Sequence, residues 1–316
     1  MSKHKTPGYY RKRTYAGQVM FMSDYFSGRM GKRGRGSPPR KKSTYEIQMA
    51  HWRRQKRELA ILVNANFEAG KDQSLTLEWG KGDEKPPDKD AMQKEMQNFI
   101  KRLRRWYQKG HTVYRREPIR DKKGRPIRNE DGSVKTKRVI DAIYVPRPDP
   151  KYIYTMEIGP RGSRHVHMIL SDVDLLEVTR CWQTGVPHGV VHGTALYEDG
   201  NYTELAEYYM KYTKPVKPEK GQEEETEGEK LGKRWYASQN LYRPEPITRK
   251  ISEKTFAKDL PDVEGYHIDE DSIRGGGMET DLNGRPFREC IYIRNEKESY
   301  RPLRSGPGKR RKRRKK

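Results

Sequence analysis

Two histidines separated by a single apolar residue are the first sign of chemistry in this chain. His165 and His167 flank Val166 in a stretch rich in β-forming residues, and Glu157 lies a short distance upstream. Alternate side chains of a strand share a face, so we expect both imidazoles to point the same way and Val166 to enter a core. Two imidazoles and one carboxylate on neighbouring strands form a donor set for a divalent cation with open positions for water or a substrate oxygen.

A second group of reactive side chains follows in residues 203–214. In a helix, at about 100° per residue, Tyr208, Lys211 and Tyr212 share one face, whereas Tyr209 lies about 100° away and is expected to pack. Tyrosines that face a metal indicate phosphodiester chemistry, with the phenol as nucleophile. Lys211 would favour the phenolate form of Tyr208 or neutralise a phosphate oxygen, because a nearby cation stabilises an anion.

Strands and helices must bring these two groups together. Period-two alternation and β-forming residues predict strands over 73–79, 152–157, 165–170 and 190–197, with a Gly-Pro-Arg-Gly turn at 159–162 joining an antiparallel pair. Capping residues and apolar spacing predict helices from residue 43 through 59 and over 88–107, 172–181 and 203–212. This alternation of strands and helices predicts an α+β fold, with helices packed on an antiparallel sheet.

The composition points to an anionic partner. The 316 residues include 68 lysines and arginines against 44 acids, a net charge of +24. Nucleic acid rewards such charge through phosphate neutralisation and counterion release, and an anionic membrane surface is the simpler rival. With 32% hydrophobic residues, we expect one core of about 180 to 200 residues with polar arms.

The chain is predicted to be soluble and intracellular, with no membrane partner. No apolar run approaches the roughly 20 residues of a membrane span, and no apolar stretch follows the first residues as in a secretory signal. Cys181 and Cys290 are the only cysteines, which fits a reducing cytosol.

Shifts in composition divide the chain. Residues 1–42 carry twelve lysines or arginines and one acid and are predicted to form a disordered basic arm. A catalytic domain is expected over 43–257, interrupted by a polar β-hairpin or flexible insertion at 116–137 and by an acidic loop at 219–229. Residues 258–316 are expected to be an extension ending in the basic run 309–316, a nonspecific phosphate contact.

Taken in order, these motifs resemble those of the HUH endonuclease superfamily, and specifically its rolling-circle replication initiators (Rep proteins). Residues 74–77 look like the first family motif, 157–167 like the second, and 208–212, of the form Tyr-x-x-Lys-Tyr, like the third. The tyrosines follow the histidines, as in replication initiators. The closest likeness is to initiators of small single-stranded DNA phages and bacterial plasmids, and residues 64–67 and 238–241 also resemble that group.

The resemblance implies a fold, a cofactor and a mechanism. The fold would be the ferredoxin-like (RRM-like) antiparallel sheet of HUH endonucleases. His165, His167 and Glu157 would hold Mg²⁺ or Mn²⁺, with Glu78 an alternative to Glu157 as the acidic ligand. Tyr208 would attack the scissile phosphate of single-stranded origin DNA, giving a 5′-phosphotyrosine and a free 3′-hydroxyl, and Tyr212 would perform the second transfer that releases a circle. The order of the two tyrosines stays open.

Basic residues near the motifs are candidates for DNA contacts. Arg161 and Arg164 flank the histidines and would anchor the DNA backbone. Arg102 and Arg105 are further candidates, although their helix face could equally be solvated.

The resemblance also implies further protein partners, and two other functions remain as alternatives. The chain has no Gly-x-x-x-x-Gly-Lys-Ser/Thr loop, so unwinding would need a host helicase and extension a host polymerase, in the cytoplasm of a bacterial or phage-infected cell. An HUH-type transposase would share the nick-and-join chemistry, and a non-catalytic basic protein that packages nucleic acid is the rival from another class.

Overall fold

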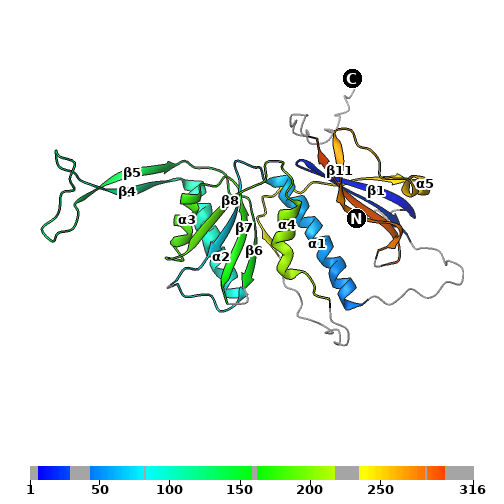
Figure 1. Ribbon diagram of the computed structural model, residues 1–316, viewed down its shortest axis with the longest axis horizontal. Helices are drawn as coiled ribbons and strands as arrows, with labels where there is room; N and C mark the ends of the chain where they lie inside the picture. Colours follow the sequence, from blue (N-terminus) through cyan, green and yellow to red (C-terminus); the bar gives the residue numbers. More distant parts are fainter. Residues whose placement is uncertain are drawn as a thin grey trace, which may run out of the picture.

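The computed structural model describes residues 6–28, 43–81, 83–158, 162–217, 235–281 and 283–295, apart from the side chains of residues 212 and 277–279. Arg161, the acidic loop 219–229 and the basic run 309–316 lie outside the described residues. The described chain has an α+β fold with antiparallel sheets, as the sequence predicts (Figure 1).

A five-stranded antiparallel sheet of order β8-β3-β7-β6-β9 carries the histidine motif. We call it the central sheet. Its strands are β3 (Gln73–Glu78), β6 (Tyr152–Ile158), β7 (Arg164–Leu170), β8 (Val190–Ala195) and β9 (Tyr236–Ala237). The strands expected over 73–79, 152–157, 165–170 and 190–197 are therefore confirmed, including the antiparallel pairing of β6 with β7.

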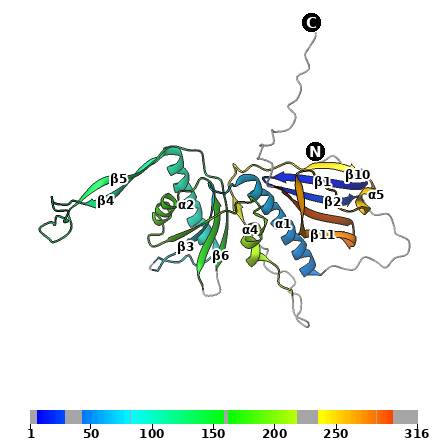
Figure 2. The same ribbon diagram turned by 45° about the horizontal axis from the view of Figure 1, so that its top comes forward.

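Helices cover both faces of the central sheet (Figures 1 and 2). The helices are α1 (Thr44–Asn66), α2 (Lys89–Lys109), α3 (Leu175–Gln183), α4 (Thr203–Met210), the 3-10 turn η1 (Lys211–Thr213) and α5 (Glu253–Ala257). α2 and α3 pack on the face that carries Leu75, Leu77 and Val166, whereas α1 and α4 pack where Ile153 and Ile169 emerge. No helix in the described part of the chain is long and apolar enough to cross a membrane.

α1 begins at the expected capping pair and is buried on more than one side. Ser43 and Glu46 form a reciprocal capping box at its start, with hydrogen bonds of 3.2 and 2.9 Å. Further along, Leu59 and Val63 share one apolar cluster with Ile169 of the central sheet and with residues of a second sheet. α1 therefore packs between two sheets.

That second sheet corrects the expectation of a disordered arm for residues 8–27, whereas residues 1–5 and 29–42 of the expected arm lie outside the described residues. Its order is β10-β1-β2-β12-β11, and its strands are β1 (Gly8–Ala16), β2 (Val19–Ser27), β10 (Ile247–Ile251), β11 (Tyr266–Thr280) and β12 (Pro286–Arg294). In β2, residues 19–22 read Val-Met-Phe-Met and are buried. The average charge of residues 1–42 conceals this apolar run. Burial of the four side chains stabilises the hairpin enough to order it.

The second sheet also crosses the expected boundaries of the catalytic domain. β10, placed inside a domain over 43–257, pairs with β1, and β12, placed in an extension over 258–316, pairs with β2. The second sheet thus draws its strands from both ends of the described chain. In place of one core with polar arms, apolar clusters lie on each face of the central sheet and within the second sheet.

A buried ion pair network lies inside the second sheet. Asp24 is fully buried, and its carboxylate accepts hydrogen bonds from Arg11 at 2.8 Å and from Arg288 at 2.9 Å. Arg11 and Arg288 lie opposite Asp24 on β1 and β12. One carboxylate therefore joins three adjacent strands.

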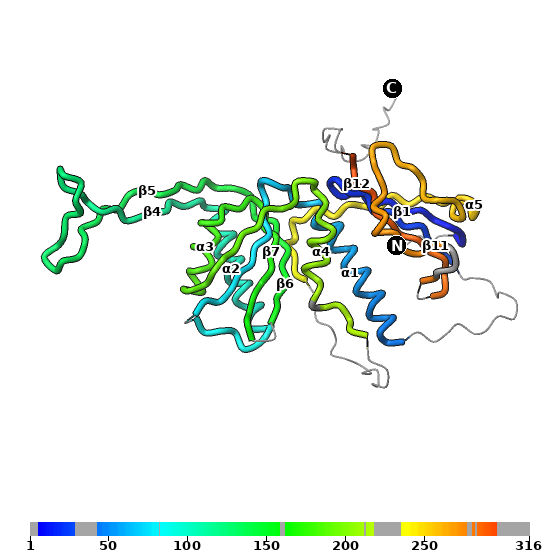
Figure 3. Tube along the Cα trace, viewed as in Figure 1, coloured from blue at the N-terminus to red at the C-terminus, as the bar shows by residue number. Residues whose placement is uncertain are grey.

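The insertion expected at 116–137 is a protruding hairpin, the first of the two forms that the sequence allowed. β4 (His111–Pro118) and β5 (Thr136–Tyr144) pair antiparallel and extend away from the helices as an arm (Figure 3). Isolated bridges between Arg120 and Pro126 and between Arg128 and Val134 continue it toward its tip.

Residues 64–67 and 238–241, which also resemble the family, make hydrogen bonds that hold the fold together. Asn66 exchanges two hydrogen bonds with the backbone of Tyr242, at 2.8 and 2.7 Å. Ser238 binds the backbone of Tyr152 at the start of β6. These contacts fix the segment after β9 against α1 and the central sheet.

We expect Asp24→Asn to destabilise the protein by about 3 to 5 kcal/mol, because it leaves two buried guanidinium groups without their anion. Urea denaturation followed by circular dichroism measures the free energy of unfolding. Asp259→Asn, an equal change at an exposed position, should stay within about 0.5 kcal/mol of the parent. Equal stability of the Asp24 variant and the parent would show that this network does not hold the second sheet.

Candidate active site

Polar side chains form two rows across the middle strands of the central sheet. In one row His165 lies opposite Glu157 on β6 and opposite Glu78 on β3. In the next row His167 lies opposite Thr155 and Thr76. Residues directly opposite in an antiparallel ladder point to the same face. The histidines therefore share one polar face, as expected.

The opposite face of β7 is apolar, which fixes the direction of the histidines. Val166 and Met168 are fully buried in the cluster beneath α2 and α3. A slip of one residue in register would put both histidines into this core and both apolar side chains outside it.

Glu157, His165 and His167 form a close group. One carboxylate oxygen of Glu157, Oε2, lies 3.3 Å from His167 Nε2, and Oε1 lies 3.9 Å from His165 Nε2. The rings of the two histidines are 5.9 Å apart. Glu157 and His167 are buried, and Glu157 Oε2 makes no well-formed hydrogen bond among the described residues.

A divalent metal requires several donor atoms around one point. Among the described residues, no three His, Cys, Asp or Glu side chains already surround one point as metal ligands do. The chemistry of the donors fits nevertheless. Burial lowers the pKa of His167, against the opposing effect of Glu157, so its imidazole is neutral and has a lone pair to give. Glu157 Oε2, which makes no well-formed hydrogen bond among the described residues, is a second atom that could bind a metal ion.

Tyr208 of α4 stands against the histidines. Its ring lies 5.3 Å from that of His167 in an edge-to-face arrangement, and Lys211 Nζ lies 3.9 Å from the centre of the Tyr208 ring. Tyr208 is 45% exposed, which leaves its phenol accessible. The structure thus brings together Glu157, His165, His167, Tyr208 and Lys211.

Tyr209 has a packing role, as expected. It is 4% exposed, and its hydroxyl forms a 2.9 Å hydrogen bond with Ser74 Oγ. Burial raises the pKa of Tyr209 well above its ordinary value. It is therefore a phenol at neutral pH and a poor nucleophile.

The expected helix over 203–212 is shorter than predicted. α4 ends at Met210, and η1 carries the chain through Lys211–Thr213. The backbone of Tyr212 lies in this turn, whereas its side chain lies outside the described residues. Contrary to the sequence prediction, Tyr208 and Tyr212 therefore do not lie on one continuous α-helix, because the backbone changes from α-helix to 3-10 turn between them.

α1 holds α4 in place. Trp52 Nε1 donates a 3.1 Å hydrogen bond to the carbonyl of Met210, and Lys56 forms a 2.6 Å ion pair with Glu207. At the start of α4, the Tyr202 amide donates to the buried side chain of Asn64. Contacts at both ends of α4 fix Tyr208 relative to the sheet.

Two residues of β3 were missed as site residues from the sequence. Thr76 Oγ1 lies 3.3 Å from His167 Nδ1, and Ser74 holds Tyr209. Both belong to the first motif. Because they alternate with the apolar Leu75 and Leu77 along a predicted strand, the sequence pattern already places Ser74 and Thr76 on the opposite face from these leucines. Thr76 orients the imidazole of His167 through the nitrogen that faces away from Glu157.

Arg164, Arg102 and Arg105, the described members of the group of arginines expected to contact DNA, do not join this site. Arg164 donates to the carbonyls of Pro86, Pro87 and Gly162. Arg102 pairs with Glu95 at 3.0 Å. Arg105 is exposed on α2, the helix that covers the other face of the sheet. Arg164 directly precedes His165 on β7, so its side chain points to the opposite face of the sheet, which α2 and α3 cover.

Comparisons of the chain with protein families, with curated proteins and with solved structures found no significant match. Function is therefore inferred from the residues of the site themselves.

Tyr209→Phe should lower the free energy of unfolding by about 1 kcal/mol, because it removes the hydrogen bond between the buried Tyr209 hydroxyl and the half-buried Ser74 hydroxyl. Tyr208→Phe makes the same chemical change one residue earlier at an exposed position and should leave stability within about 0.5 kcal/mol. Urea denaturation of both variants measures the difference. A larger loss in the Tyr208 variant would reverse the two roles.

In metal-free protein, His167 should titrate below the ordinary histidine pKa of about 6.5, because burial disfavours its cation. The unfolded chain then takes up this proton at higher pH than the folded chain, so His167 reduces stability as pH falls below about 6.5. Glu157→Gln should lower the pKa of His167 further by removing the anion beside it. NMR titration of the imidazole signals, with exposed Glu204→Gln as control, measures both effects. A rise in the Glu157 variant would contradict the effect assigned to Glu157, and a His167 pKa above about 6.5 in the parent protein would contradict the burial argument.

Proposed function

We propose that this chain is a metal-dependent endonuclease and strand transferase of the HUH type, which nicks single-stranded origin DNA and starts rolling-circle replication. The observation that carries the proposal is the placement of Tyr208 against His167, in a group that also contains Glu157 and His165. These side chains come from β6, β7 and α4, and they match the second and third motifs of the family that the chain resembles.

The residues of the site suit transfer of a phosphodiester bond to tyrosine. The phenolic oxygen of Tyr208 forms a bond to phosphorus while the bond from phosphorus to the 3′ oxygen breaks. The phenolic proton is lost to solvent, and the 3′ oxygen gains a proton to become a hydroxyl. The 5′-phosphotyrosine keeps the energy of the phosphodiester, so the reverse transfer rejoins DNA without a nucleotide cofactor.

Neighbouring side chains support this transfer. Lys211 lies over the Tyr208 ring and adds positive charge where phenolate and phosphate oxygens would meet. Thr76 fixes the ring of His167. Glu157, His165 and His167 would hold Mg²⁺ or Mn²⁺, which when bound polarises the scissile phosphate and offsets charge on its oxygens. We assign Tyr212 to the second transfer that closes a circle.

Single-stranded DNA fits the surroundings as substrate. The net charge of +24 favours a polyanion. The phenol of Tyr208 is accessible, and a flexible single strand can bring its phosphate to a tyrosine on a short, firmly held helix.

We expect a covalent protein–DNA adduct when the protein is mixed with labelled single-stranded origin DNA and Mn²⁺. On a denaturing gel, Tyr208→Phe and the double variant His165→Ala/His167→Ala should each reduce the adduct by about a hundredfold or more, since nucleophile and metal ligands act in one step. Tyr209→Phe serves as the matched control on the same helix and should retain it. Tyr212→Phe should form the adduct and fail to release circles.

An adduct that persists in the Tyr208 variant and disappears in the Tyr212 variant would exchange the two tyrosines. Binding without any adduct, unchanged by all these substitutions, would instead identify a nucleic-acid packaging protein. Cleavage confined to the ends of a mobile element would identify an HUH-type transposase.

A further inference from the structure

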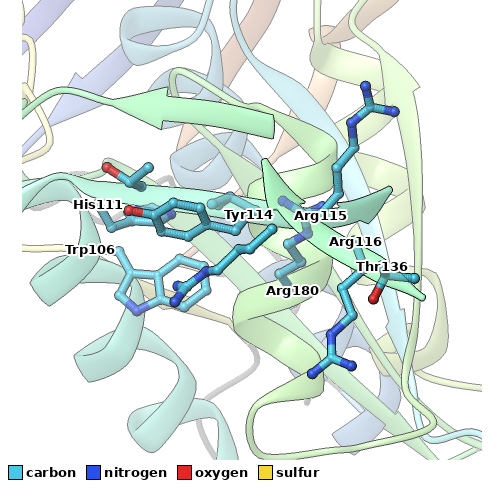
Figure 4. A pocket seen from close by; sticks show the side chains of 10 residues that line it. Trp106, His111, Tyr114, Arg115, Arg116, Thr136 and Arg180 are labelled. Atoms are coloured by element: carbon cyan, nitrogen blue, oxygen red, sulfur yellow. The ribbon is translucent and has the colours of Figure 1, made fainter. Parts of the chain in front are cut away.

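A pocket of about 830 Å³ lies at the base of the hairpin arm, where β4 and β5 meet α2 and α3 (Figure 4). Its size is that of a site for a small molecule or a nucleotide. Arginine and aromatic side chains dominate its walls, with Thr112, Val113 and Thr136 between them. Those side chains are Arg115, Arg116, Arg138, Arg180, Trp106, His111 and Tyr114.

The four arginines differ in how their charge is balanced. Arg115 pairs with Glu117 and Asp141, and Arg180 pairs with Asp141 at 2.8 Å. Among the described residues, Arg116 and Arg138 have no acidic partner. The pocket therefore keeps positive charge that the protein itself does not neutralise.

Arg116 and Arg138 lie directly opposite each other in the β4–β5 ladder. Like charges at opposed positions destabilise a strand pair, because their side chains begin only about 5 Å apart. An anion between them would turn this repulsion into attraction. A phosphate group suits two guanidinium groups, since each can donate parallel hydrogen bonds to its oxygens.

The aromatic side chains add flat surfaces beside the unpaired charge. The Arg138 guanidinium lies 3.7 Å from the centre of the Tyr114 ring, so it is held in place. The His111 ring lies between Trp106, at 4.3 Å, and Tyr144, at 4.7 Å. Rings and guanidinium planes of this kind stack on nucleobases without regard to sequence.

Buried polar atoms at the pocket lack well-formed hydrogen bonds, although Glu177 Oε1 lies 3.8 Å from His111 Nδ1. Both ring nitrogens of His111 and one guanidinium nitrogen of Arg180 are buried without a hydrogen bond among the described residues. Such atoms cost free energy, and a bound polar ligand would remove that cost.

We propose that this pocket binds a nucleotide of a nucleic-acid strand, with a phosphate between Arg116 and Arg138 and the base against the aromatic side chains. The arm beyond the pocket favours a strand over a free nucleotide, because Lys122 and Lys123 are exposed near its tip and would meet further phosphates. α2 and α3 border the pocket and cover the face of the sheet opposite Tyr208. The pocket is thus a second site, and it does not depend on the proposed chemistry.

The test is binding of a fluorescent oligothymidine to the full chain, followed by anisotropy over a range of salt concentrations. We expect Arg116→Gln/Arg138→Gln to weaken binding about tenfold near 0.1 M salt and to reduce the salt slope by about one unit. Tyr114→Ala should weaken it about fivefold or more through lost stacking. Lys254→Gln/Lys258→Gln removes the same charge at two exposed positions away from the pocket and should change affinity less than about threefold.

Equal losses in the two double variants would show that the protein attracts DNA by its net charge alone, and this result would overturn the proposed binding pocket. Displacement of the oligomer by thymidine monophosphate at equal nucleotide concentration would assign the pocket to a free nucleotide. This result would overturn the proposal that the pocket binds a nucleic-acid strand. All measurements are made in a Tyr208→Phe background without metal. Binding at the pocket is therefore read separately from adduct formation, and either can fail without the other.

Discussion

The two-residue period of β7 is the constraint on which the rest of the structure depends. This strand must supply Val166 and Met168 to the core beneath α2 and α3 while it presents His165 and His167 to the other side. Because the burial of one face fixes the register, the polar rows on the other face are fixed with it. The neighbouring strands then bring Glu157, Glu78 and Thr76 beside the histidines, and α4 needs only to approach that face.

Patterns that span a few residues could be predicted, and long-range pairings could not. The alternation in β3, β6 and β7 and the capping box of α1 are local, so the sequence predicts the central sheet and the group of Glu157, His165 and His167. The second sheet could not be predicted because its strands come from distant segments of the chain, with Phe21 opposite Ile291. The end of α4 at Met210 depends on Trp52, which binds the last carbonyl from another helix.

Counting charge also misplaced several arginines. Arg164 and Arg102 look like DNA contacts in the sequence, yet one supports the loop before α2 and the other pairs with Glu95. Arg11 and Arg288 are held by Asp24 inside the second sheet. Part of the positive charge is thus structural, and net charge alone cannot tell which arginines remain for a partner. The uncompensated pair on the arm becomes visible only through strand register.

The pairing of β12 with β2 has a consequence for synthesis of the chain. The strands of the central sheet lie between residues 73 and 237 and can pair before β12 (residues 286–294) leaves the ribosome. The β1–β2 hairpin precedes these strands in the sequence, but its neighbours β10 and β12 follow them. A nascent chain must therefore carry an open strand edge and an uncovered side of α1 until β12 has been made, a state that invites aggregation and chaperone binding.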